Sequence, residues 1–205
     1  MKKIFTLGAL VAATTLLSFK PATDKAPAPA ASTWSVDAVH SNVKFTVTHL
    51  VISEVDGAFK VFDGNMTSEK EDFSDAKISF SVDVATINTE NEMRDNHLKS
   101  DDFFNAGKFS KMNFVSTSFK KVSGNKYELK GNLTIRDVTK PITFQVTYGG
   151  TVKDPYGNVK AGFKAKGTVN RFDYGLKWNS VTEAGGAVVG QDVEILCNIQ
   201  MVKKG

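Results

Sequence analysis

The sequence predicts an all-β fold, an eight-stranded antiparallel up-and-down barrel with a short helical crossover near residues 90–106. Three observations support this prediction. From Thr33 onward apolar and polar residues alternate with a period of two over most of the chain, the pattern of strands with one buried and one solvated face. There are eight such runs, and no second hydrophobic element of matching size covers them. Closing the sheet on itself leaves no exposed edge, whereas a two-sheet sandwich uses the same alternation and is the alternative.

The eight runs follow one another between segments of turn residues. Their bounds are 43–49, 59–61, 78–84, 111–121, 127–136, 142–148, 161–169 and 189–201. In the second run Phe59 and Val61 alternate with Lys60, which places both apolar side chains on the inward face. The fourth run is mixed in phase, because Phe114 and Phe119 fall on opposite faces of a regular strand. The sequence does not orient that run.

The segment between the third and fourth runs has no strand pattern, and its first half is compatible with a short helix. Within it, Arg94, Asp95 and His97 resemble part of a hydrolytic site. The favoured interpretation is that charged neighbours pin a crossover, which Phe103 and Phe104 hold against the barrel.

Turn chemistry marks the later connections. The segment 137–141 joins the fifth and sixth runs into a hairpin, with Pro141 at an edge where a missing N–H is harmless. Asp154-Pro155-Tyr156-Gly157-Asn158 is a second turn. After the seventh run, Arg171 and Asp173 are interpreted as residues that pin a loop.

The lengths of the strands and the sizes of the inward residues bear on what the barrel holds. Strands of roughly ten to fourteen residues at about 3.3 Å per residue are about 33–46 Å long, beyond the usual strand. Small inward positions leave room between the rings of Phe45, Phe59, Phe80, Phe144 and Phe163; they are Val43, Val47, Val61, Ala161, Ala165, Gly167 and Val169. An apolar tunnel would favour a hydrophobic chain. A core fully packed by phenylalanines is left open as the alternative.

The histidines and the single cysteine give little support for an enzyme. His40 and His49 are nine residues apart, which puts them on opposite faces of an unbroken strand, so a metal site shared with His97 is disfavoured. His49 is either a core side chain or a polar group at the barrel mouth that hydrogen-bonds a head group. Cys197 lies on an apolar face and is expected to be a buried, unreactive thiol. Motifs of hydrolases, metalloproteases and nucleotide-binding enzymes are missing from the sequence, and no enzymatic activity is predicted.

The N-terminal region predicts export. Residues 1–19 combine a basic start with an apolar stretch of signal-peptide length, and Lys20 ends that stretch too early for a membrane span. We interpret residues 1–19 as a secretory signal, residues 20–32 as a Pro/Ala-rich linker and residues 33–203 as the barrel domain; an uncleaved anchor is the alternative. Signal and linker account for most of the formal charge of +4. The nearly neutral domain has no basic stripe for nucleic acid, and we expect a soluble periplasmic or secreted protein.

Several spaced motifs resemble the YceI-like family. They are Trp34–Ser41, Phe45–Leu50, Gly57 with Phe59, Arg94–Ser100 with Asp102–Phe104, Gly131–Ile135 with Val138–Pro141, and Asn170–Gly175. They follow the family's order and cover the chain from Thr33 to about Val202. The resemblance implies a lipocalin-like barrel that binds a polyisoprenoid, an isoprenoid quinone or a similar long-chain amphiphile in an elongated cavity, usually in the periplasm. One departure is Asp137, where the family tends to have glycine; Asp tolerates a left-handed conformation, so the hairpin is expected to survive.

On this basis we predict a non-enzymatic lipid-binding protein with no cofactor other than a bound isoprenoid-type lipid. Along the lipid chain the predicted contacts are Phe45, Val47, Phe59, Phe80, Phe144, Phe163 and Ala165, with His49 facing the head group and Trp178 lining the mouth. Transient membrane contact is included in this prediction. The sequence does not set the oligomeric state, for which a homodimer is left open. The alternatives are a stress-response or protein-interaction module that meets its partner through residues 88–108, and, least favoured, a metal-dependent hydrolase.

Overall fold

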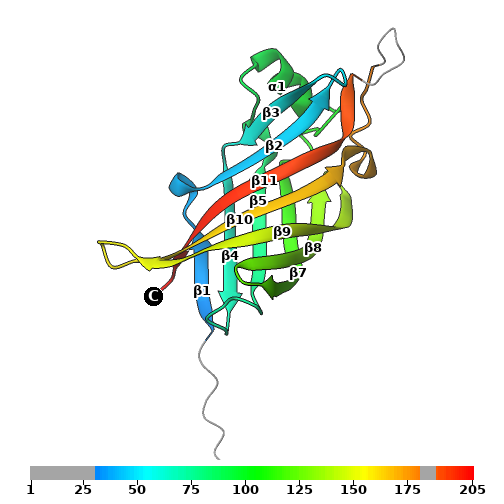
Figure 1. Cartoon of the computed structure of the whole chain (residues 1–205). Helices are drawn as coiled ribbons and strands as arrows, with labels where there is room; N and C mark the ends of the chain where they lie inside the picture. Colours follow the sequence, from blue (N-terminus) through cyan, green and yellow to red (C-terminus); the bar gives the residue numbers. More distant parts are fainter. Residues whose placement is uncertain (1–30, 181–187) are drawn as a thin grey trace, which may run out of the picture.

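A computed structural model describes residues 31–180 and 188–205, which form a closed antiparallel β-barrel with one short α-helix at one end (Figure 1). The strands are β1 (Ser32–Val36), β2 (Asn42–His49), β3 (Ser53–Phe59), β4 (Phe62–Ser68), β5 (Lys77–Asp83), β6 (Ile87–Asn88), β7 (Lys111–Ser123), β8 (Lys126–Ile135), β9 (Val138–Lys153), β10 (Val159–Asn170) and β11 (Val189–Lys203). The helix is α1 (Glu92–Lys99), and short 3-10 turns are η1 (Ala38–His40), η2 (Val84–Thr86) and η3 (Arg171–Tyr174). The predicted signal peptide, residues 1–19, and nearly all of the predicted linker, residues 20–32, lie outside the described residues.

Ten segments, β1 to β5 and β7 to β11, make eight barrel strands, because two of the barrel strands each consist of two segments. β1 and β2 both pair with β11, at different levels, and η1 separates them. β3 pairs with β2 and β4 pairs with β1, so these two segments form the neighbouring barrel strand. β5, β7, β8, β9, β10 and β11 complete the ring, which the pairing of β1 with β11 closes. The predicted eight-stranded barrel is confirmed, and the sandwich alternative is wrong.

On the side away from β1 and β2, the barrel strand formed by β3 and β4 forms backbone pairs of unequal length with its neighbours. β4 pairs with β5 from Phe62 to Thr67. β3 pairs with β6 only through Ala58 with Asn88 and Phe59 with Ile87. At this end the barrel wall therefore depends on the crossover that contains α1.

The interruption between β3 and β4 also changes the phase of the strand. Phe59 and Phe62 are both buried, whereas Val61 is 55% exposed. Inward positions here are three residues apart rather than two, because β3 ends at Phe59 and β4 begins at Phe62. The predicted inward position of Val61 is wrong. The eight predicted runs also did not include β1, which buries Trp34 and continues into β2 as one barrel strand.

A β-bulge explains the mixed phase of the fourth predicted run. The register between β7 and β8 shifts between Ser116 and Ser118. One extra residue on β7 at this point brings Phe114 and Phe119, five positions apart, to the same face of the sheet. Both phenylalanines are buried in the barrel.

The hairpin between β8 and β9 has a shorter turn than predicted. Arg136 and Asp137 alone form it, and the left-handed residue is Arg136, with φ of 57°, rather than Asp137. The Arg136 guanidinium donates hydrogen bonds to the carbonyl oxygens of Asp101 (3.3 Å) and Phe103 (3.2 Å), which fixes the turn against the crossover. Pro141 lies within β9, at a level where β9 does not pair with β10.

The crossover contains a helix, as predicted, and charged side chains hold it in place. Asn91 caps α1 by accepting a hydrogen bond from the Arg94 backbone N–H at 2.9 Å. The buried carboxylate of Asp95 accepts from the Thr89 N–H (2.8 Å) and hydroxyl (2.6 Å), and Arg94 donates to the Thr89 hydroxyl and carbonyl. The interpretation of Arg94 and Asp95 as pins of the crossover is confirmed. Among the residues that the structure describes, no helix is long and apolar enough to cross a membrane.

Candidate ligand-binding cavities

An inner cavity of about 170 Å³ lies inside the barrel, and its wall is apolar. All eight barrel strands contribute to that wall, from Val36 of β1 to Met201 of β11. A void without polar partners does not hold ordered water, so it suits an apolar occupant. The structure therefore does not have the fully packed phenylalanine core that the sequence left open.

Pairs of phenylalanine and glycine keep this cavity from being filled. In each pair a ring lies against a glycine of the adjacent strand, and a Cβ placed on that glycine would come within 3.0 Å of a ring atom. The pairs are Phe45 with Gly57, Phe80 with Gly64, Phe114 with Gly131, and Phe144 with Gly167. Because glycine has no side chain, each ring lies along the wall instead of across the bore.

Six aromatic rings close one end of the barrel, and we call them the aromatic plug: Trp34, Phe73, Phe119, Tyr127, Tyr148 and Phe163. Phe73, from the loop between β4 and β5, is 3% exposed and lies 5.3 Å from Trp34 and 5.5 Å from Phe163 between ring centroids. The Tyr127 hydroxyl donates to the carbonyl oxygen of Asp72 at 2.7 Å, which ties that loop to β8. Phe119 and Phe163 also line the inner cavity, so the plug is its floor.

A second cavity of about 420 Å³, the mouth cavity, lies at the opposite end. It is lined by the β2–β3 hairpin, α1, the segment around Phe103, the residue Trp178 and the start of β11. Met93 lines it and is 84% exposed, so the mouth cavity reaches the surface there. Phe45 lines both cavities, and its ring packs 5.7 Å from that of Phe59. The two cavities are therefore neighbours that share Phe45.

An aromatic group and a buried arginine shape one wall of the mouth cavity. The His97 ring lies 5.1 Å from that of Phe103 and 5.0 Å from that of Trp178, and His97 Nε2 donates to Asp102 Oδ2 at 2.8 Å. Arg171 is 4% exposed and donates to four carbonyl oxygens, those of Leu176 (2.6 Å), Trp178 (2.7 Å), Gly190 (2.8 Å) and Val189 (3.1 Å). Burial lowers the pKa of this guanidinium. Arg171 thus pins the loop after β10, as the sequence suggested, and positions Trp178.

The nine residues predicted to bind lipid all line one of the two cavities. Phe45, Phe59, Phe80, Phe144, Phe163 and Ala165 line the inner cavity, and Phe45, Val47, His49 and Trp178 line the mouth cavity. Contact of these residues with a lipid stays a prediction. Sequence reasoning missed Phe114 and Phe119, because the bulge in β7 hides their common face, and it missed Met93 and Leu98 of α1 as cavity residues.

Cys197 of β11 lies on the wall of the inner cavity. Burial away from solvent raises the pKa of its thiol to about 12, which disfavours the reactive thiolate. The position of this thiol on an apolar face agrees with the expectation, and its lack of reactivity stays a prediction.

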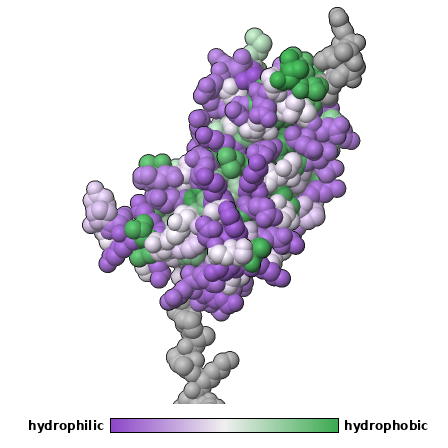
Figure 2. Space-filling view, in the orientation of Figure 1, coloured by the Kyte–Doolittle hydropathy of each residue, from purple (hydrophilic) through white to green (hydrophobic). Residues whose placement is uncertain are grey.

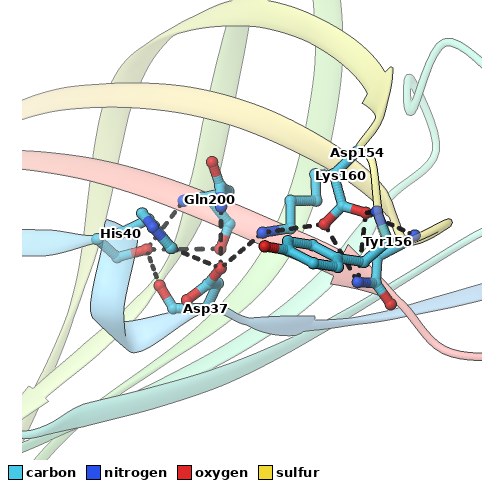
Figure 3. Close-up of polar contacts among 8 residues, drawn as sticks. Asp37, His40, Asp154, Tyr156, Lys160 and Gln200 are labelled. Carbon is cyan, nitrogen blue, oxygen red and sulfur yellow. Dashed lines mark hydrogen bonds and ion pairs between the residues drawn. The ribbon is translucent and has the colours of Figure 1, made fainter.

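A polar network around Asp37 holds the interrupted first strand in place (Figure 3). Its Oδ2 accepts hydrogen bonds from His40 Nδ1 and Gln200 Nε2, both at 2.9 Å, and from Lys160 Nζ at 3.4 Å. Lys160 also lies 3.5 Å from Asp154 Oδ2. Partial burial raises the pKa of Asp37, but the three hydrogen bonds outweigh it and bring the pKa down to about 2. The network joins η1 to β10, β11 and the β9–β10 turn.

The three histidines do not form a metal site. His40 belongs to the Asp37 network, whereas His49 and His97 line the mouth cavity. Within residues 31–180 and 188–205, no three His, Cys, Asp or Glu side chains are placed to hold a metal ion.

These features define a class of protein: an antiparallel β-barrel closed around an apolar cavity, with aromatic rings packed at one end and a second, partly polar cavity at the other. The family model of the YceI-like domain matches residues 34–201. The chain belongs to the YceI-like family.

Relatives and solved structures agree with this assignment. The UPF0312 protein SAS2572 of Staphylococcus aureus (strain MSSA476) is 40% identical over 162 residues, covering 78% of this chain and 92% of that protein. The crystal structure of the Campylobacter jejuni YCEI protein is 31% identical with a TM-score of 0.65, covering 77% of this chain and 90% of that one. A polyisoprenoid binding domain from Saccharophagus degradans shares the fold, with a TM-score of 0.61 and 15% identity, covering 83% of this chain and 98% of that one.

Proposed function

We propose that this protein binds one long-chain isoprenoid-type lipid, such as a polyisoprenoid or an isoprenoid quinone, and carries it without chemical change. The observation that carries the proposal is the apolar inner cavity enclosed by all eight barrel strands. Membership of the YceI-like family supports it, and so does a fold shared with a domain described as polyisoprenoid-binding.

The distribution of polar groups orients the ligand. The inner cavity presents an apolar wall, whereas His49, Asn91, Arg94 and His97 all line the mouth cavity. Nitrogen and amide groups of this kind hydrogen-bond to oxygen-bearing head groups such as a quinone carbonyl or a pyrophosphate. The head group therefore lies at the mouth and the isoprenoid chain in the bore.

The sizes of the two cavities assign a role to Phe45. Sites for drug-sized ligands usually measure about 300–1,000 Å³, so the inner cavity of about 170 Å³ is too small for a long chain by itself. A chain that reaches from the mouth cavity into the bore has to pass Phe45, which lines both. We infer that the Phe45 ring turns aside when the lipid enters.

We further propose that the protein works in the periplasm or outside the cell. Residues 1–19 have the basic start and short apolar stretch of a secretory signal. The intact mass of the protein purified from its host tests this: loss of an N-terminal segment ending within residues 17–31 is expected, and a full-length mass in the cytoplasmic fraction would contradict it.

Native mass spectrometry of the protein purified from its own host, followed by organic extraction, tests the lipid. We expect a complex with one lipid per chain and an isoprenoid fragmentation pattern in the extract. Lipid-free protein that captures a partner protein would instead favour an interaction module. A stoichiometric metal lost in His49→Ala would favour a metalloenzyme.

A matched pair of variants locates the lipid in the bore. Ala165 lines the inner cavity and Thr168, on the same strand, is exposed. Ala165→Trp should fill the cavity and reduce bound lipid by roughly tenfold or more, because the ring occupies the volume of the chain. Thr168→Trp should bind as the unaltered protein does. Equal lipid content in both variants, with circular dichroism showing folded barrels, would place the ligand elsewhere.

A further inference from the structure

The turn between β2 and β3 exposes three consecutive apolar side chains, which we call the apolar turn. Leu50, Val51 and Ile52 are 39%, 70% and 87% exposed. Within residues 31–180 and 188–205 no other three consecutive large apolar residues are exposed in this way. Figure 2 shows a compact group of hydrophobic atoms at this end of the molecule, where the β2–β3 hairpin ends in Figure 1.

The backbone of this turn is unsuited to the residues that occupy it. The Ile52 N–H donates to the His49 carbonyl oxygen at 3.3 Å, and the two central residues, Leu50 and Val51, have φ of 51° and 67°. Turns with two positive φ angles strongly favour Asn-Gly, and a β-branched residue is strained there. The hairpin would form more readily with polar turn residues. Three exposed apolar side chains at a strained position indicate a function in contact with something outside the barrel.

The apolar turn lies beside the opening of the mouth cavity. Val47, Thr48 and His49 of the same hairpin line that cavity. Met93 of α1, which is 84% exposed, also lines it. Exposed apolar groups therefore stand on two elements of the mouth.

The charges beside the apolar turn disfavour anionic partners. The charged side chains of β3 next to the turn are Glu54 and Asp56, both exposed and both acidic. Such a surface is not attracted to anionic lipids or to acidic proteins. Insertion of the three apolar side chains into an apolar phase does not depend on attraction between charges, so an uncharged lipid surface fits this turn.

We propose that the apolar turn inserts into the surface of a lipid bilayer and sets the mouth cavity against it. A ligand with a long apolar chain is nearly insoluble in water and has to enter from a lipid phase, so contact of the mouth with a bilayer gives it a dry path. This purpose rests on the proposed function, whereas the contact itself is measured without any cargo.

Flotation with phosphatidylcholine vesicles tests the contact. The double variant Leu50→Asn, Val51→Gly gives the turn the residues that its backbone favours, so its melting temperature should be equal or higher. Its vesicle-bound fraction should fall by roughly tenfold or more, because the inserted apolar area is lost. Val122→Ser and Val152→Ser are the controls, since these valines are 66% and 63% exposed on β7 and β9, near the plug end. They should bind vesicles unchanged.

A fluorescent label shows which end inserts. Val51→Cys and Val122→Cys can each carry an environment-sensitive dye, because Cys197 is buried in the barrel and does not compete for it. Added vesicles should shift the emission of the dye at position 51 to the blue and leave that at position 122 unchanged.

Four results would overturn the proposal: no flotation of the unaltered protein, equal flotation of the double variant, binding only to anionic vesicles and only at low salt, or self-association through the turn without vesicle binding. Failure of the proposed function is recognised separately, as normal flotation of a protein that never contains lipid.

Discussion

The two ends of the barrel are closed by different kinds of interaction. At the plug end, six aromatic rings pack against one another and Phe73 is almost fully buried. At the mouth end, two arginines, Arg94 and Arg171, donate hydrogen bonds to backbone carbonyls, and the aromatic side chain of Trp178 is only partly buried. Aromatic packing dominates one end, whereas at the other end directed polar contacts add to a smaller aromatic group of His97, Phe103 and Trp178 around a cavity. We therefore expect the side chains of the aromatic plug to contribute more to the free energy of unfolding, and the side chains of the mouth cavity to contribute more to ligand binding.

The sharpest test of this comparison is a pair of truncations. Phe73→Ala should lower the free energy of unfolding by about 3–5 kcal/mol, because it opens a cavity among packed rings. Trp178→Ala should cost less than about half of that while reducing bound lipid. Urea denaturation followed by circular dichroism measures both. Equal losses of stability would mean that the two ends are built alike.

The next effect concerns the Phe45–Gly57 pair between the cavities. Gly57→Ala should lower the free energy of unfolding by about 1–3 kcal/mol, because the new methyl group displaces the Phe45 ring. Gly162→Ala is the matched control, since a Cβ on Gly162 meets nothing within 4 Å.

A double-mutant cycle identifies the cause. In a Phe45→Ala background most of the cost of Gly57→Ala should disappear, because the ring that it displaces is gone. Additive losses would show that the ring is not the cause, and would assign the cost to the backbone or to Thr89 Cγ2, which lies 2.9 Å from the added methyl group.

The smallest effect is electrostatic and lies outside both ends. The pKa of Asp37 in the folded protein, about 2, is below its ordinary 3.8, so its stabilising contribution is complete above about pH 4 and is lost as the pH falls from 3.8 towards 2. Asp37→Asn should therefore be less stable than the unaltered protein by about 1 kcal/mol at pH 7, with the difference vanishing near pH 2. Urea titrations of both proteins at pH 7, 4 and 2 measure it; a difference that does not depend on pH would assign the loss to geometry.

Much of the barrel could be predicted because alternation is a local property of each strand. The strand phases placed Phe80, Phe144, Phe163 and Ala165 on the cavity wall. Interruptions could not be predicted in this way, since partners distant in the sequence set them: the Val61 N–H, for example, donates to the Thr86 hydroxyl between β3 and β4.

The ends of the barrel were the harder part for the same reason. Phe73 is a single aromatic residue in a polar loop, without any periodicity that marks it as the centre of a plug. Leu98 and Met93 line the mouth cavity because the crossover folds back over this end of the barrel. No local sequence pattern predicts against which part of the barrel a crossover packs. The apolar residues of the cavity wall could therefore be predicted from the sequence, whereas the way in which the two ends of the barrel are closed could not.

The short pairing between β3 and β6 has a mechanical consequence. A ladder of two residue pairs resists separation far less than a long unbroken ladder such as that between β10 and β11. Widening the barrel on this side strains few backbone hydrogen bonds, because side chains of the crossover, such as Phe104 against Phe59, supply much of the contact there. We therefore expect the barrel wall at the β3–β6 pairing, beside the mouth cavity, to deform more easily than the wall around the aromatic plug.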